Sequence, residues 1–151
     1  MARIKIDGPA SFPFFTHIPI RITDINYGGH AGNDAFLALV HEARMQFLRQ
    51  CGYTELAMAG IGLIMQDAAI EFKGELFYGD TVRVSVAADA FTRVSFDLYY
   101  KLEKIPASPE EQPALAALVK TGMVGYDYTR KKIAALPEQA VTRLQHPSSS
   151  H

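Results

Sequence analysis

One long helical pattern, set among segments of extended character, limits the folds open to this chain more than any other feature. The pattern begins at Asn33, which we interpret as the N-cap, and ends at Cys51-Gly52, where glycine favours helix termination. Between these points apolar residues recur at helical spacing, at Phe36, Leu37, Val40, Ala43, Phe47 and Leu48. Leu39 and Met45 make a second face apolar, so we expect other elements to surround most of this helix.

Five segments rich in β-branched and aromatic residues, bounded by Gly, Pro or Asp, are predicted to be strands. The first covers residues 17–23, where Pro19 restricts it to a sheet edge or a strand start. The others cover residues 62–72, 81–88, 93–102 and 118–128. No second long helical pattern separates these four, so short connections and antiparallel pairing are expected. The sequence therefore predicts an α+β fold, with an exposed loop over 105–113 and a last short helix within 136–144.

Length, composition and charge restrict the class of protein. With 151 residues, 48% of them hydrophobic, the chain suits one domain over 1–151 with a flexible tail at about 146–151. The net charge of −1 disfavours nucleic-acid binding, and no apolar stretch reaches the roughly 18 residues of a membrane span. The lone Cys51 and the scattered histidines lack metal-site spacing. We expect a soluble cytoplasmic protein without metal or membrane association.

Two motifs in a fixed order carry a resemblance to a known family. The first runs from 23 to 36 as Thr-Asp-Ile-Asn-Tyr-Gly-Gly-His-Ala-Gly-Asn-Asp-Ala-Phe, and His-Glu-Ala-Arg follows at 41–44. The second is Ile-Glu-Phe at 70–72, followed by Tyr-Gly-Asp-Thr at 78–81. Together they resemble the signature of the 4-hydroxybenzoyl-CoA thioesterase-like hotdog family over nearly the whole chain. The resemblance implies a hotdog fold, in which about five antiparallel strands wrap one central helix, and acyl-CoA hydrolysis without a cofactor.

Asn26 departs from that family, in which the second acidic residue of the loop is the usual nucleophile or general base. An amide can hold a water molecule or bind a carbonyl, but it cannot take the water's proton. We therefore predict that the base is Glu42, because related thioesterases carry a catalytic carboxylate on this helix and because burial would strengthen it as a base. His30 is the second candidate, with capping or subunit contact as its alternative role. Asp24 is expected to close the turn more than to act in catalysis.

The start of the helix is the predicted place for the thioester carbonyl. Backbone N–H groups there lack acceptors inside the helix and lie at the positive end of its dipole. Asn33 matches the family's oxyanion position, and Gly32 precedes it in the loop. The basic cluster Arg130-Lys131-Lys132 is the candidate for binding the phosphates of coenzyme A. We expect His41 and Cys51 to be helix-packing residues.

Two other functions stay open at this level. Asp24-x-Asn26 followed by His30 is similar to the motif of hotdog hydratases and dehydratases, which act on enoyl or β-hydroxyacyl thioesters, although the histidine comes one residue late. The missing carboxylate at Asn26 also permits a non-catalytic acyl-thioester-binding protein. For the thioesterase, free sheet edges and incomplete cover of the helix predict a homodimer or tetramer with sites shared between subunits.

Overall fold

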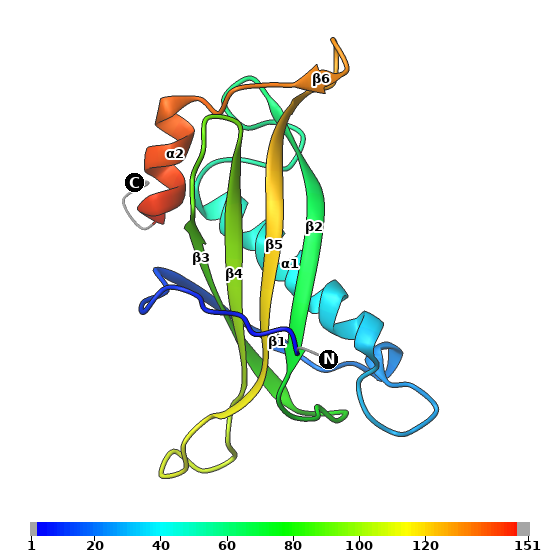
Figure 1. Ribbon diagram of the computed structural model, residues 1–151. Helices are drawn as coiled ribbons and strands as arrows, with labels where there is room; N and C mark the ends of the chain where they lie inside the picture. The colour runs from blue at the N-terminus through cyan, green and yellow to red at the C-terminus, as the bar shows by residue number, and fades with distance from the viewer. Residues whose placement is uncertain (1–2, 148–151) are drawn as a thin grey trace.

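An antiparallel sheet with one long helix lying across its inner face forms most of the structure (Figure 1). The structure, a computed structural model, describes residues 3–147. Its elements in chain order are β1 (Phe14–Pro19), the 3-10 turn η1 (Ile22–Asp24), α1 (Asn33–Gln50), β2 (Gly62–Phe72), β3 (Thr81–Asp89), β4 (Ser95–Lys104), β5 (Ala114–Asp127), β6 (Lys132–Ile133) and α2 (Glu138–Gln145).

The five long strands have the spatial order β1-β3-β4-β5-β2, and the two-residue β6 pairs with β5. All pairings are antiparallel, as the short connections predicted. β1 and β2 therefore form the two edges of the sheet among the described residues. β2 carries a bulge between Met65 and Asp67, which disrupts the regular register on one of these edges.

The first strand and the start of the helix differ from the sequence prediction. β1 lies earlier than residues 17–23, and it ends at Pro19. Residues 22–24 instead form η1, because the carboxylate of Asp24 accepts a hydrogen bond from the backbone N–H of Arg21 at 2.8 Å. The N-cap of α1 is Gly32, not Asn33, since Gly32 has the extended backbone (φ −72°, ψ 165°) that precedes the first helical residue.

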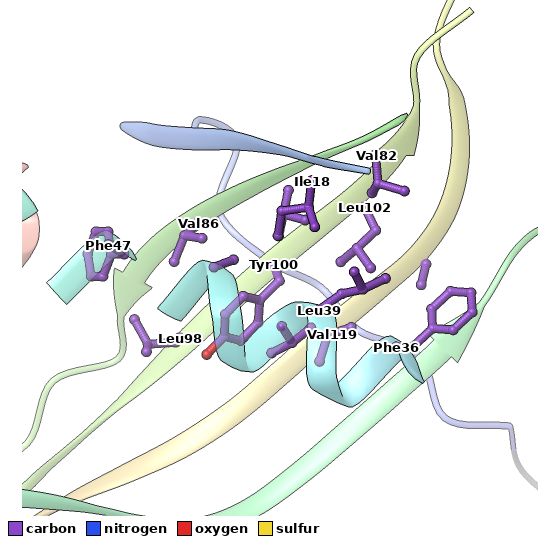
Figure 2. Close-up of a cluster of buried hydrophobic side chains, with 14 of the residues drawn as sticks. Ile18, Phe36, Leu39, Phe47, Val82, Val86, Leu98, Tyr100, Leu102 and Val119 are labelled. Carbon is purple, nitrogen blue, oxygen red and sulfur yellow. The ribbon is translucent and has the colours of Figure 1, made fainter. Parts of the chain in front are cut away.

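The core lies between α1 and the inner face of the sheet (Figure 2). Along β4, alternate residues point toward α1, and Phe96, Leu98, Tyr100 and Leu102 are almost fully buried. Phe47 and Leu39 enter the same cluster from α1. Each large apolar side chain buried in this way contributes roughly 1.5–3 kcal/mol of transfer free energy, so this layer of contacts fixes how α1 crosses the sheet.

One face of α1 stays uncovered, which contradicts the expectation that other elements surround most of the helix. The residues Asn33, Asp34, Leu37, Ala38, His41 and Glu42 are exposed and form what we call the exposed stripe of α1. They recur at intervals of three and four residues, so they lie along one side of the helix. The sheet of a single chain is too narrow to cover this side.

The remaining segments close the outside of the fold. Residues 3–13 cross the outer face of the sheet, where the backbone N–H of Ile6 donates to Glu71 at 3.2 Å and Lys101 lies 5.1 Å from the ring centre of Phe12 (Figure 1). α2 packs through Ala140 and Leu144, as the predicted last helix. Of the tail expected at 146–151, residues 148–151 lie outside the described part.

Candidate active site

The glycine-rich loop between η1 and α1 is held in one shape by its own backbone. The N–H of Asn26 donates to the carbonyl of His30 at 3.0 Å, and the N–H of Gly29 donates to the carbonyl of Asn26 at 3.1 Å. Gly29 has φ of +86°, a conformation that side chains other than glycine resist. The N–H of Ala31 binds the carbonyl of Leu76 at 2.7 Å, which fastens the loop to the β2–β3 connection.

Three predicted site residues lie within this loop or at its start. Asp24 is buried, and its carboxylate binds the guanidinium of Arg21 at 3.3 Å, so its side chain closes the turn. The side-chain oxygen of Asn26 accepts the N–H of Gly28 at 2.9 Å, and the residue is exposed. The Nδ1 atom of His30 lies 3.1 Å from the carbonyl of Ala31, so this ring is engaged by the backbone of its own loop.

The start of α1 presents backbone N–H groups to solvent. Gly32 has no side chain to cap them, and helix geometry leaves the N–H groups of Asn33 and Asp34 without an acceptor inside the helix. Both residues are exposed. Absence of a capping side chain is what an oxyanion site needs, because a cap would occupy the donors that must meet the carbonyl oxygen.

Glu42 is exposed, so the burial expected to make it a strong base is absent in the single chain. Its carboxylate accepts a hydrogen bond from the side-chain amide of Gln46 at 2.7 Å, and the carbonyl oxygen of that amide accepts one from the hydroxyl of Thr16. Thr16 belongs to β1. The carboxylate of Glu42 is therefore turned toward the β1 edge, and it forms no ion pair with Arg44.

Arg44 instead lies at the centre of a polar chain that the sequence prediction missed. Its Nε donates to Glu55 at 2.9 Å, and its Nη1 donates to the phenol oxygen of Tyr100 at 3.2 Å. The phenol oxygen is 2.8 Å from the hydroxyl of Thr121. At its outer end, Glu55 lies 3.1 Å from Nε2 of His41. The sequence does contain an indication of this polar chain. Arg44 shares a helix face with core residues, and a buried arginine needs a partner.

Burial and ion pairing shift the pKa values of several groups on α1 and the strands beside it. Burial opposes the charge of Arg44, but its contacts with Tyr100 and Glu55 outweigh that effect and raise the pKa of the guanidinium. Burial also raises the pKa of Tyr100. At the other end of α1, burial raises the pKa of the Cys51 thiol to about 12, which makes this cysteine a packing residue and a poor nucleophile. His41, in contrast, is not a packing residue, since 58% of its side chain is exposed.

Two hollows flank the exposed stripe of α1. The β1-side hollow, of about 380 Å³, is lined by Pro19, Arg21, Glu42 and Gln46 among others. The β2-side hollow, of about 290 Å³, is lined by Leu37, Ala38, Val40, His41, Arg44, Met65 and Thr121. His41 lines both hollows, whereas Glu42 lines the β1-side hollow and not the β2-side hollow.

The structure does not bring the basic cluster near the loop within one chain. Arg130, Lys131 and Lys132 are exposed at the β5–β6 turn, at the opposite end of the sheet from the start of α1 (Figure 1). Within residues 3–147, no group of three or more His, Cys, Asp and Glu side chains is arranged to hold a metal ion. No helix in that range is long and apolar enough to cross a membrane.

Most of the chain matches a known protein family. Residues 20–144 match the model of the family described as "Thioesterase-like superfamily". This chain belongs to that superfamily. The match covers the loop, α1 and the whole sheet from β2 to β6, and the fold is the hotdog fold that the sequence predicted.

Solved structures of this superfamily superpose on the chain at low sequence identity. A thioesterase superfamily structure from Jannaschia sp. CCS1 is 15% identical, with a TM-score of 0.79 over 93% of this chain and 86% of that one. The 1,4-dihydroxy-2-naphthoyl-CoA thioesterase Slr0204 from Synechocystis is 21% identical, with a TM-score of 0.75 over 91% and 96%. An Asp-to-Asn mutant of 4-hydroxybenzoyl-CoA thioesterase complexed with 4-hydroxybenzoyl-CoA is 15% identical, with a TM-score of 0.77 over 87% and 98%.

Proposed function

We propose that this chain hydrolyses acyl thioesters of coenzyme A to the free acid and coenzyme A. The observation that carries the proposal is the uncapped start of α1, where the N–H groups of the exposed residues Asn33 and Asp34 have no acceptor within the helix, beside the glycine-rich loop. Two of the superposed relatives are named as acyl-CoA thioesterases or complexed with an acyl-CoA, which supports the same substrate class. No cofactor is part of the proposal.

The chemistry of the site follows from these donors. A water molecule attacks the thioester carbon, and the carbonyl oxygen gains negative charge as the tetrahedral intermediate forms. Free amides at the positive end of a helix stabilise that oxygen without having to reorganise. Asn26 can orient the water or the carbonyl, but a separate group must take the water's proton.

We also propose that the working unit is a homodimer formed through β2. This strand is an 11-residue sheet edge, and the five residues from Ile64 to Ala68 are all exposed. Met65 (45% exposed) and Leu37 (41% exposed) leave an apolar surface beside the β2-side hollow. β1 is a poorer edge, because it has six residues and ends at a proline.

The spacing of the site residues also supports a dimer. Glu42 lies nine residues beyond Asn33, which is about 14 Å along the helix axis. A group at that distance cannot act on a carbonyl that binds at the start of its own helix. A base on α1 therefore comes to each site from the exposed stripe of the partner subunit's helix, where the sequence favoured Glu42. Likewise, Arg130, Lys131 and Lys132 can reach coenzyme A only from another subunit.

A panel of acyl-CoAs, both saturated and 2-enoyl, tests the function. Release of free thiol from the parent protein supports the thioesterase, with a thiol reagent as the readout. The buried Cys51 does not consume the reagent while the protein is folded. Loss of the enoyl absorbance without thiol release would instead identify a hydratase, and binding without either change would identify a non-catalytic binding protein.

A further inference from the structure

His41 of α1 and Glu55 of the α1–β2 connection form a histidine–carboxylate pair that Arg44 anchors to the core. His41 Nε2 lies 3.1 Å from Glu55 Oε1, and the other oxygen of Glu55 accepts from Arg44 Nε at 2.9 Å. Only 7% of the Arg44 side chain is exposed, and its contact with Tyr100 fixes it from the other side. The backbone carbonyl of Glu55 is itself bound by the N–H of Leu63 at 2.6 Å. This pair is thus held more firmly than an ordinary surface contact.

The contact with Glu55 decides which nitrogen of His41 is free. An ionised carboxylate only accepts hydrogen bonds, so the neutral ring must carry its proton on Nε2. Nδ1 is then a lone-pair nitrogen, and the residues that the structure describes offer it no hydrogen bond. A base oriented by a second group that is oriented by a third is the arrangement that activates water in many hydrolases.

The side of the helix on which each candidate lies separates His41 from Glu42. Glu42 is turned toward β1 by Gln46, away from the edge that we propose as the dimer interface. His41 lines the β2-side hollow with Met65, a residue of that edge. His41 also lines the β1-side hollow, but only His41 and not Glu42 reaches the β2 side, so in a dimer formed through β2 it is His41 that is open to the partner subunit.

Helix spacing brings His41 to the correct place. A two-fold axis through the β2 edges makes the two copies of α1 antiparallel. If the axis passes beside Leu37, which lines the β2-side hollow together with Met65, Asn33 and His41 lie four residues to either side, each about 6 Å along the helix. Asn33 of one protomer then stands opposite His41 of the partner subunit, so the oxyanion donors and the imidazole meet at one carbonyl.

We propose that His41, oriented by Glu55, is the general base of the hydrolysis, acting across the subunit interface. This inference rests on the proposed thioesterase function. Nδ1 takes a proton from water as the water oxygen bonds to the thioester carbon, and the oxyanion binds at the start of the partner's α1. The carbon–sulfur bond then breaks, and the imidazolium returns the proton to the leaving sulfur. The products are the acid and the free thiol of coenzyme A.

The decisive variant is His41→Ala, because the exposed ring contributes little to the core and its loss should leave folding intact. On the acyl-CoA that the parent protein hydrolyses best, kcat should fall by about 10²-fold or more. Added imidazole should restore part of the rate, since it can enter the space that the side chain vacates. His17→Ala is the matched control, as another exposed histidine, and should keep the parent rate with no response to imidazole.

Several outcomes would overturn this assignment. His41→Ala at the parent rate, in a folded dimer, eliminates His41 as the base. If Glu42→Gln or His30→Ala is then inactive, the base is the corresponding residue that the sequence suggested. A parent protein that releases no thiol from any acyl-CoA fails the proposed function itself, which is a different result from an active parent with an active His41→Ala variant.

Glu55 is a positioning residue in this scheme, and a double-mutant cycle tests that role. Glu55→Gln alone should lower kcat while KM changes little. In the His41→Ala background the same substitution should have no further effect on kcat, because its influence passes through the imidazole. Equal losses in both backgrounds would show that Glu55 acts only through stability, and the role in orienting His41 would be wrong.

Discussion

The guanidinium of Arg44 donates a hydrogen bond to the phenol oxygen of Tyr100 at 3.2 Å inside the core. Tyr100 is 1% exposed, and its oxygen also contacts the hydroxyl of Thr121. Together these two contacts join α1 to the central strands β4 and β5. The bond to Tyr100 also anchors the arginine that holds Glu55, so the stability of the core and the orientation of His41 depend on the same contact.

Tyr100→Phe should lower the free energy of unfolding by about 1–3 kcal/mol, because it leaves a buried donor of Arg44 without its acceptor and the hydroxyl of Thr121 without its partner. Urea unfolding followed by circular dichroism measures this. Tyr78→Phe is the matched control, since Tyr78 is 66% exposed and its change should stay within about 0.5 kcal/mol. Equal stability of the two variants would show that the phenol oxygen contributes nothing to the core.

Asn33→Pro should lower kcat by about 10²–10³-fold, because proline removes one oxyanion donor. The substitution suits the site, since proline is favoured at the first helical position and Gly32 already has the extended backbone that precedes proline. Asn33→Ala keeps the backbone N–H and should retain much more activity. If the alanine variant loses as much as the proline variant, the side chain and not the amide is the important group.

Asn26→Asp should keep or raise the rate of hydrolysis, because it restores the carboxylate that related enzymes use as base or nucleophile. The loop should tolerate the change, since the aspartate oxygen can still accept the N–H of Gly28. Steady-state kinetics and a melting temperature report the two effects separately. A folded variant that loses a hundredfold in kcat would mean that the amide itself takes part.

Met65→Glu should convert the dimer to a monomer and abolish hydrolysis, because the two introduced carboxylates would face each other across the β2 edges. Met65 is already 45% exposed in the single chain, so folding should survive. Sedimentation velocity at micromolar concentration gives the mass of each species. Phe15→Glu, at a residue that is 58% exposed on β1, the opposite edge of the sheet, should stay dimeric. A parent protein that is active and wholly monomeric would refute the shared site.

The stability of the fold should decline above about pH 9. Burial raises the pKa of the Cys51 thiol from its ordinary value of 9.0 to about 12 in the folded state, so the thiol of the unfolded chain ionises first. Stability is therefore fully present below the unfolded pKa and is lost as the pH rises toward the folded one. Unfolding by urea at about pH 8 and about pH 10 measures the loss. The Cys51→Ala variant should lose less free energy of unfolding between these two pH values than the parent protein. An equal loss in both proteins would exclude the thiol as a cause.

The periodic parts of the fold were predictable from the sequence. The strand at 62–72 has the predicted bounds, and the helix from 33 and the loop at 105–113 were found because apolar spacing and turn residues act over short distances. The N-cap was not predictable, because asparagine is a favourable N-cap residue and only the backbone conformation of Gly32 shows which residue precedes the helix. The predicted bounds of the first strand were wrong for a similar reason. The alternation of apolar and polar residues continues past Pro19, where the chain has already left the strand.

The candidate site, like the fold, was predictable from the sequence only in part. The sequence alone determined the glycine loop and the substitution of Asn26 for an acid, because both are local in the chain. Only the tertiary structure decided that Arg44 pairs with Glu55, and that Glu42 turns toward β1 while His41 also reaches the β2-side hollow. Adjacent residues on a helix point about 100° apart, so which of them faces a neighbour depends on how the helix lies on the sheet. That angle is set by the packing of the whole core.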